Sequence, residues 1–450
     1  MRRKVYQKLV DWKRREQGSS ALLIQGARRV GKSYIVEEFA KSEYDTYVLI
    51  DFNKARDDVR GLFLHDLNDL DVFFLKLSAL YNTRLIPRRS LIVFDEVQLF
   101  PRARSAIKYL VADGRFDYIE TGSLMSIKKN VQDILIPSEE DAIDMHPMDF
   151  EEFCWAMGNE SIVPLARECF ERSRPMGQAL HRKAMDLFRQ YLLVGGMPQA
   201  VAAYADSRDF ERLDRVKRRI LKLYRDDIRK HAGRDVLRVE AIYDELPSQL
   251  KNQNRHFKLA SVERGATFDE FRDSLFWLSD AMVVNNCYNT TEPSLGLNLN
   301  RERTTLKCYM ADTGLLISHS FDERGLIDEQ VYKKILLDKL EVNMGMVIEN
   351  AVAQMLRASG HTLYFYANPS REDAASRMEI DFLIAKSSIT NRHNISPIEV
   401  KSSSRYTLSS LRKFMAKYPA QLHTPYVVHP ADYKEEGGIR FIPLYMVPFL

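Results

Sequence analysis

The chain has 450 residues, too many for one compact core, so we expect two to four domains. A formal net charge of +4 is small for this length, so overall charge does not indicate a nucleic-acid-binding protein, and any basic surface must be local. Four cysteines show neither close pairing nor metal-ligand spacing, which favours reduced thiols. Charged residues interrupt any N-terminal export signal, and no apolar run could span a bilayer, so we expect a cytoplasmic protein without membrane contact.

A phosphate-binding motif stands near the start of the chain. The apolar run 21–25 leads into Gly26-Ala27-Arg28-Arg29-Val30-Gly31-Lys32-Ser33, which has G-x-x-x-x-G-K-S spacing, and a helical pattern follows. Glycines let backbone N–H groups turn toward phosphates, Lys32 reaches the β- and γ-phosphates, and the Ser33 hydroxyl ligates Mg²⁺. The positive N-terminal end of the helix adds to this attraction. We therefore predict that these eight residues bind ATP with Mg²⁺.

The first 150 residues alternate apolar strands with helical patterns, which predicts a parallel sheet covered by helices. Strands are expected at 21–25, 47–52, 91–94, 118–120 and 142–145. The third strand ends in Asp95-Glu96, a Walker B arrangement of two carboxylates at the edge of a buried parallel strand. Asp95 is predicted to hold Mg²⁺ through a water, and Glu96 to orient and polarise the attacking water. The alternative interpretation is a solvated acidic pair at a strand end.

The fourth expected strand ends in Glu120-Thr121-Gly122-Ser123, whose hydroxyls are candidates for sensing the γ-phosphate. Thr121 is the better candidate of the two. Loops after strands also carry Thr, Gly and Ser simply as turn formers, so this alternative stays open.

The middle of the chain is predicted to be helical and then to form a winged helix. Within 213–223, apolar residues at helical spacing alternate with arginines and lysines, which indicates either a solvated face or contact with a phosphate backbone. Helices expected at 238–250 and 268–280 precede strands expected at 282–289 and 305–311, with a polar wing tip between these strands. Winged helices bind DNA, but they also mediate protein contacts.

A charged helical connector over 320–345 leads to a last α/β region. Its strands are expected at 361–367, 378–385, 397–401, 425–429 and 439–447, and its helices at 345–358 and 408–417. This alternation predicts a small α/β domain of its own.

A second set of candidate catalytic residues lies in this last region. Asp381 follows Glu379 by two residues, and Lys401 follows Glu399 by two, so each pair shares one face of its strand. If the strands are neighbours, Asp381, Glu399 and Lys401 converge, as metal-assisted phosphodiester hydrolysis needs, with both acids holding Mg²⁺. Glu349 shares a helix face with apolar residues and is expected to point inward toward the same site. The alternative is ordinary alternation of charged and apolar residues on a half-exposed sheet.

Together these motifs resemble the prokaryotic P-loop ATPases of the AAA-like superfamily that carry a C-terminal DUF4143 domain similar to PD-(D/E)XK nucleases. The resemblance covers nearly the whole chain and also includes the motifs at 121–123, 146–153, 191–198, 224–228, 309–315, 379–382 and 397–401. It implies an α/β protein with an ATPase core at 1–155, a helical lid at 156–235, a winged-helix-like domain at 236–325 and a nuclease-like domain at 326–450. Lys32, Ser33, Asp95 and Glu96 match the nucleotide motifs, and Glu349, Asp381, Glu399 and Lys401 match the nuclease-like core.

One departure concerns the arginine that completes many ATPase sites. Relatives often place a Gly-Arg pair before the 146–153 motif, but 131–150 contains no arginine, so Arg225 or another arginine, in cis or from a neighbouring subunit, would serve. The predicted function is a Mg²⁺-dependent ATPase that couples nucleotide state to binding or processing of double-stranded DNA. The alternative is a non-enzymatic ATP-gated switch that binds DNA or a protein partner with an inert nuclease-like scaffold. A protein partner or a homo-oligomer is a further expectation.

Overall fold

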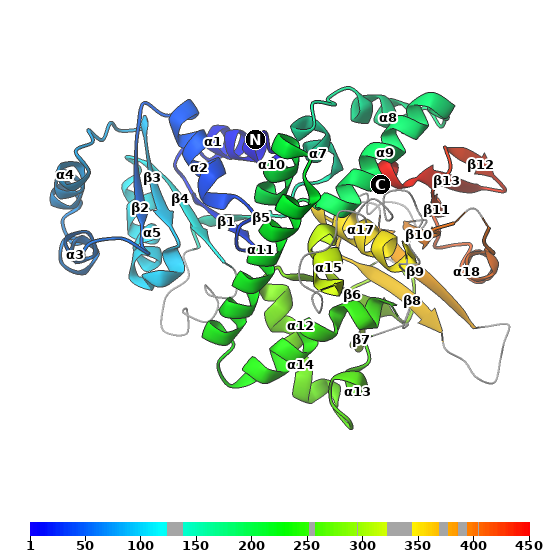
Figure 1. Cartoon of the computed structure of the whole chain (residues 1–450). Helices are drawn as coiled ribbons and strands as arrows, with labels where there is room; N and C mark the ends of the chain where they lie inside the picture. Colours follow the sequence, from blue (N-terminus) through cyan, green and yellow to red (C-terminus); the bar gives the residue numbers. More distant parts are fainter. Residues whose placement is uncertain are drawn as a thin grey trace. The chain divides into compact units, whose positions relative to one another are not determined.

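A computed structural model describes residues 1–123, 138–251, 257–294, 296–321, 344–368, 377–385, 394–403 and 405–450 (Figure 1). These residues form two units, Met1–His146 with Asp280–Met282, and Pro147–Ser279 with Val283–Leu450. Both units combine helices and strands, which confirms the predicted α/β class. Most of the predicted connector at 320–345 lies outside the described residues.

The first unit contains a five-stranded sheet in the order β2-β3-β4-β1-β5, in which every neighbouring pair is parallel. All five strands expected in this region are confirmed: β1 (Ala21–Gly26), β2 (Thr46–Asp51), β3 (Ser90–Asp95), β4 (Asp117–Gly122) and β5 (Glu140–Met145). Because β4 lies between β1 and β3, its carboxyl end separates the phosphate-binding loop from the strand that ends in Asp95.

Helices cover both faces of this sheet (Figure 1). Leu91 and Val93 of β3 pack with α1 (Val5–Glu16) and α2 (Lys32–Glu43) on one face. The alternate residues of β3 pack on the other face with α3 (Asp57–His65), α4 (Leu70–Tyr81) and α5 (Pro101–Asp113). A strand buried on both faces needs apolar residues at every position, which is why this strand is a continuous apolar run.

The second unit begins with helices. They are α7 (Phe150–Ala156), α8 (Ile162–Glu171), α9 (Gln178–Val194), α10 (Pro198–Ser207), α11 (Phe210–His231), α12 (Val236–Lys251), α13 (Leu259–Val262) and α14 (Phe268–Asp280). The basic segment at 213–223 lies in α11, whose arginines largely pair with carboxylates of the same unit. These pairs are Arg212–Asp206, Arg215–Glu211, Arg218–Asp214, Arg225–Asp244 and Arg229–Glu240. This pairing favours a structural role for much of the positive charge of α11.

The second unit also contains an eight-stranded sheet in the order β12-β13-β11-β10-β9-β8-β6-β7. Its strands are β6 (Val284–Thr290), β7 (Arg301–Met310), β8 (Tyr364–Asn368), β9 (Met378–Ala385), β10 (Ile395–Val400), β11 (Tyr426–His429), β12 (Lys434–Glu436) and β13 (Ile439–Pro443). β6 pairs with β7 on one side and with β8 on the other. The two strands predicted as a wing therefore belong to the same sheet as the C-terminal strands, which differs from the predicted boundary at 325/326. The remaining domain boundaries stay predictions.

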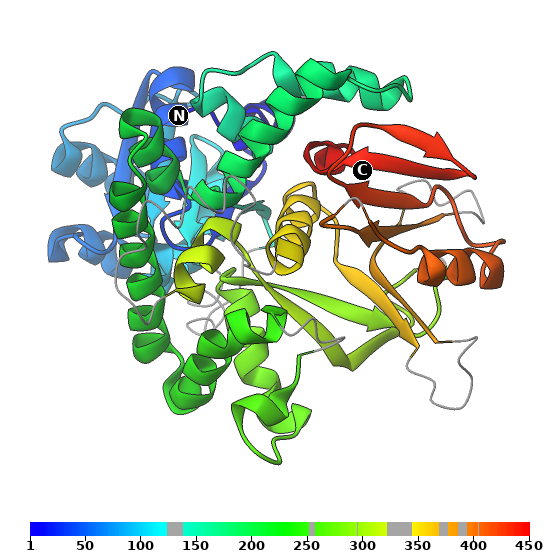
Figure 2. The same cartoon turned by 45° about the vertical axis from the view of Figure 1, so that its right-hand side comes forward.

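Two helices position the C-terminal residues on this sheet (Figure 2). Helix α17 (Met344–Ala358) contacts β6, β7 and β10, and α18 (Ser409–Lys417) contacts β9. A further helix, α15 (Thr313–Ser320), follows β7 and was not predicted. Among the described residues, no helix is both long enough and apolar enough to cross a bilayer.

Candidate nucleotide-binding and carboxylate sites

The phosphate-binding motif forms the loop between β1 and α2. Gly31 caps the helix with φ 100° and ψ 24°, a left-handed conformation that favours glycine. At Gly26, an added Cβ would lie 2.5 Å from the carbonyl oxygen of Met145, so close packing also requires glycine there. The Lys32 ammonium donates hydrogen bonds to the carbonyl oxygens of Gly26 (2.9 Å) and Ala27 (3.2 Å). The Lys32 side chain therefore folds over the loop and contacts its backbone, at the place where phosphates are predicted to bind.

The remaining loop residues differ in exposure. Arg28 and Arg29 are exposed, whereas Val30 is buried in the apolar cluster between the sheet and α2. Arg29 has a positive φ of 69°. The eight predicted residues thus run from the last residue of β1 through a loop into the first turn of α2, as a phosphate site requires.

Three predicted residues meet at the carboxyl ends of β3 and β4. The Ser33 hydroxyl donates to Asp95 Oδ1 at 2.8 Å, and the Thr121 hydroxyl donates to the same oxygen. Asp95 is buried, with 8% of its surface exposed. The structure therefore brings together the residues predicted to hold Mg²⁺ and the residue predicted to sense phosphate.

Glu96 occupies the turn that follows β3. Its φ of 56° is left-handed, which is uncommon for a residue with a Cβ and occurs often at functional sites. Its backbone N–H donates to the Thr121 hydroxyl oxygen at 3.3 Å, and its carboxylate accepts a hydrogen bond from the Gln98 side-chain amide. Gln98 was not predicted as a site residue, since its only sequence signal is a polar side chain two residues after Glu96.

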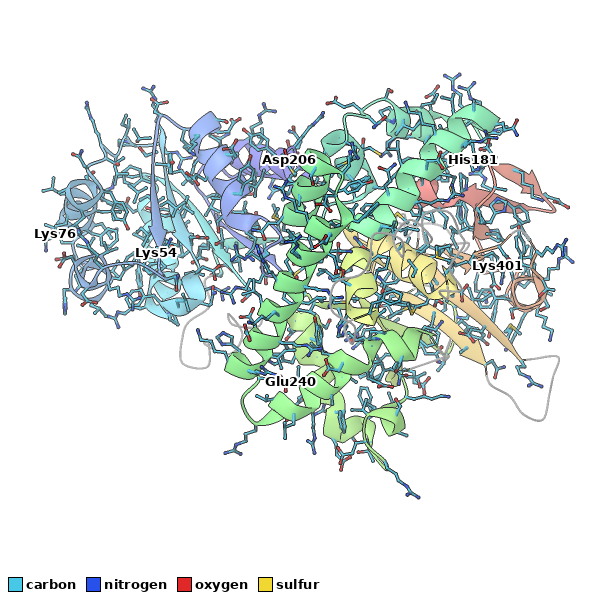
Figure 3. All side chains as sticks on the ribbon, in the orientation of Figure 1. Lys54, Lys76, His181, Asp206, Glu240 and Lys401 are labelled. Carbon is cyan, nitrogen blue, oxygen red and sulfur yellow. The ribbon has the colours of Figure 1, made fainter. Side chains whose placement is uncertain are left out.

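The four predicted nuclease-like residues line one cavity of about 420 Å³ in the second unit. Strands β9 and β10 are antiparallel neighbours, as the prediction required. The backbone N–H of Val400 donates to Asp381 Oδ2 at 2.7 Å, and Lys401 donates to Glu399 Oε1 at 2.7 Å. Lys401, labelled in Figure 3, follows the carboxyl end of β10. Glu349 enters the same cavity from α17.

Burial and neighbouring charges shift the pKa values of the carboxylates in this cavity. Desolvation raises the pKa of Asp381 well above its usual range, and the nearby charges of Glu349 and Glu399 raise it further. Desolvation also raises the pKa of Glu399, which the ammonium of Lys401 opposes. Within the part of the chain that the structure describes, Glu399 Oε2 is buried without a hydrogen-bond partner.

Lys307 also lines this cavity, and no pattern in the sequence predicts it there. This residue of β7 lies with its Nζ 3.1 Å from Glu349 Oε1 and 3.1 Å from Glu379 Oε1. Burial lowers the pKa of Lys307, but the charges of the surrounding carboxylates together raise it above its ordinary value. Its strand was predicted to be part of a wing, and only the pairing of β6 with β8 brings that strand to the C-terminal sheet.

Candidate metal ligands differ between the two sites. In the first unit, the Ser33 hydroxyl and the Asp95 carboxylate lie within hydrogen-bond distance at the N-terminus of α2. Both groups have oxygen atoms of the kind that bind Mg²⁺. Throughout the described ranges, no group of three or more His, Cys, Asp or Glu side chains is arranged to hold a metal ion. The metal-ligand role predicted for Asp381 and Glu399 therefore stays a prediction.

Family models match most of the chain in three segments. Residues 18–154 match an AAA domain, residues 185–324 match a domain of unknown function (DUF8612), and residues 344–447 match a domain of unknown function (DUF4143). The chain therefore carries an AAA domain and a C-terminal DUF4143 domain. This confirms the resemblance drawn from the motifs, and it places the loop 26–33 in the AAA domain and the cavity residues Glu349, Asp381, Glu399 and Lys401 in the DUF4143 domain.

Solved structures are similar only at a distance. The Walker-type ATPase PABY2304 of Pyrococcus abyssi is 15% identical, with a TM-score of 0.40, over 71% of this chain and 95% of that chain. The ORC1 protein of Aeropyrum pernix, solved in complex with DNA, is 12% identical, with a TM-score of 0.25, over 74% of this chain and 91% of that chain. Such low scores support no argument about function. No curated protein matches the chain.

Proposed function

We propose that this protein hydrolyses ATP with Mg²⁺ in its AAA domain and couples its nucleotide state to engagement of double-stranded DNA by the C-terminal domain. The observation that carries the ATPase proposal is the convergence of Ser33 and Thr121 on one oxygen of Asp95. This arrangement joins the helix that follows the phosphate loop to the ends of two strands, where a bound γ-phosphate would lie.

Each candidate site residue of the AAA domain discussed below has a role in this proposal. Lys32 exchanges its bonds to the loop carbonyls for the β- and γ-phosphate oxygens. Ser33 and Asp95 would hold Mg²⁺, which when bound neutralises charge on the phosphates. Glu96 orients and polarises the attacking water, with its carboxylate held by Gln98 until nucleotide binds. Thr121 holds the Asp95 carboxylate and the backbone of Glu96 at once, and so fixes these two residues relative to each other.

An arginine that stabilises the transition state is still needed. Arg225, the candidate named from sequence, pairs with Asp244 at 2.8 Å. We keep the proposal that Arg225 or another arginine, in cis or from a second copy of the chain, supplies this charge.

The choice of DNA as the partner rests on the C-terminal domain. Helix α17, strands β8, β9 and β10, helix α18 and strand β11 follow one another along the chain, and Asp381, Glu399 and Lys401 lie on or directly after the second and third of these strands. This order supports the nuclease-like assignment. The second candidate function is an ATP-gated switch with slow turnover, for which the same DNA, a protein or a second copy of the chain would be the partner.

Fluorescence anisotropy with a labelled DNA duplex tests the coupling. Glu96→Gln should bind ATP without turning it over, and we expect its affinity for the duplex to differ between ATP and ADP by about tenfold. Lys32→Ala should show no such difference. Equal affinities with ATP, with ADP and without nucleotide would refute the coupling to DNA. Nucleotide-dependent DNA binding by a wild-type protein that releases no phosphate from ATP would favour the switch.

A further inference from the structure

The cavity of the DUF4143 domain contains a cation supplied by the chain itself. We infer that the Lys307 ammonium occupies the place of a divalent metal ion, so that this nuclease-like site binds no Mg²⁺ and cuts no DNA by metal-assisted hydrolysis. The inference rests on the nuclease-like assignment made in the proposed function. It specifies that the domain engages DNA without cutting it.

The contacts of Lys307 carry this inference. Its ammonium bridges Glu349 of α17 and Glu379 of β9, at 3.1 Å from an oxygen of each. The hydroxyl of Tyr309 donates to the same oxygen of Glu349. Lys307 is 7% exposed, so it is part of the cavity wall and not a surface side chain that bends inward. A positive group therefore already pairs with the inward carboxylate of Glu349, for which a metal site was the expected partner.

The other carboxylates of the cavity are also largely satisfied from within the chain. Asp381 accepts the backbone N–H of Val400, and Glu399 accepts the ammonium of Lys401. One oxygen, Glu399 Oε2, has no partner among the described residues. Among the described residues, no three His, Cys, Asp or Glu side chains are grouped to hold a metal ion, whereas Mg²⁺ and Mn²⁺ prefer several oxygen ligands at once.

Binding a divalent ion would require Lys307 to leave. The displaced ammonium would lose its ion pairs with Glu349 and Glu379, and within this wall it would be left as an unpaired buried charge. The strand order of the sheet accounts for the position of Lys307. Strand β7 pairs with β6, and β6 pairs with β8, so the folded sheet places Lys307 beside the cavity.

Mn²⁺ binding measured by electron paramagnetic resonance tests the inference without ATP, DNA or activity. Asp95→Asn serves as the parent protein, because it removes the carboxylate of the AAA domain from the measurement. We expect this parent to bind no Mn²⁺ in the DUF4143 cavity. Adding Lys307→Met should create one site there, with an affinity for Mn²⁺ at least about tenfold higher than that of the parent. Adding Asp381→Asn as well should abolish that site. Lys434→Met, the same change at an exposed lysine, should create none.

Two results would overturn the inference. One is Mn²⁺ binding by the parent that disappears on Asp381→Asn, and this comparison retains Lys307, so it decides the question even if Lys307→Met does not fold. The other is a folded Lys307→Met variant, judged by circular dichroism, that gains no site. Since nucleotide and DNA are absent throughout, a failure of the ATPase or DNA proposal leaves this test unaffected.

Discussion

At the scale of single residues, one oxygen of Asp95 organises the AAA site. It accepts hydrogen bonds from Ser33 on α2 and from Thr121 at the end of β4. The sequence predicted all three residues because each lies in a short motif. It could not show that Thr121 also accepts the backbone N–H of Glu96, because that contact depends on the order of strands in the sheet.

Thr121→Val tests this organisation. The change removes the donor to Asp95 and the acceptor for Glu96, so we expect kcat to fall by roughly tenfold to a hundredfold. ATP affinity should change little, because Lys32 and the loop are untouched. Thr121→Ser retains the hydroxyl and should stay near the wild-type rate. Equal rates for the Val and Ser variants in a steady-state phosphate-release assay would contradict the role of the hydroxyl.

Lys217 gives the second unit a predicted pH dependence. Burial lowers the pKa of this lysine to about 8, and its ammonium donates to the carbonyl oxygens of Leu193 and Gly314. Between pH 8 and the ordinary value of 10.5, the unfolded chain binds more protons than the folded chain at this site. The contribution of Lys217 to the free energy of unfolding therefore rises with pH across this window, by about 1 kcal/mol per unit.

Thermal unfolding of wild type and Lys217→Met at pH 7.5, 8.5 and 9.5, roughly spanning this window, measures that contribution. The difference in melting temperature should shift in favour of wild type as the pH rises. Lys222→Met, at an exposed position on the same helix, should show no such trend. A wild-type to Lys217→Met difference that stays constant with pH would contradict the prediction.

At the scale of elements, Asp312 joins two motifs that the sequence recognised only as patterns. Its carboxylate caps α15 by accepting the N–H of Leu315 at 2.8 Å. It also accepts the N–H of Gly196 in the turn between α9 and α10. The motifs at 191–198 and 309–315 are therefore two sides of one buried contact, which has a structural role.

Asp312→Ala should destabilise the second unit by about 3 kcal/mol, because two buried N–H groups would lose their acceptor. Asp312→Asn keeps one acceptor oxygen and should cost less. Asp206→Ala removes an exposed ion pair with Arg212 and should change the free energy of unfolding by less than about 1 kcal/mol. Urea denaturation followed by circular dichroism gives these values, and an Asp312→Ala loss as small as that of Asp206→Ala would refute the role of Asp312.

The predicted elements succeeded where the pattern is local. Strand β3 is apolar at successive positions because both of its faces are buried, and that run is visible in the sequence. Strand β12 was missed because all three of its residues are charged and exposed. The pairing of β6 with β8, and hence the place of Lys307 in the cavity, joins segments far apart in the chain and leaves no local pattern.

At the scale of the whole molecule, this pairing predicts which pieces of the chain fold. A fragment 326–450 lacks β6, β7 and Lys307, so one of the two neighbours of β8 and the cation that pairs with Glu349 and Glu379 would be missing. We expect this fragment to be unfolded, because β8 would lose its pairing with β6 and the half-buried carboxylates of Glu349 and Glu379 would lose their cation. The fragment 147–450 retains these groups and should unfold cooperatively. Cooperative melting of 326–450 in circular dichroism would show that the predicted boundary at 325/326 is a true domain boundary.

Phosphate release from ATP by the full chain, with Mg²⁺, with and without a DNA duplex, is the most direct test of the proposed function. We predict measurable turnover by wild type, stimulation by the duplex, and loss of turnover by about a hundredfold or more in both Lys32→Ala and Glu96→Gln. Full turnover in both variants would show that the loop 26–33 and the end of β3 do not form the hydrolytic site.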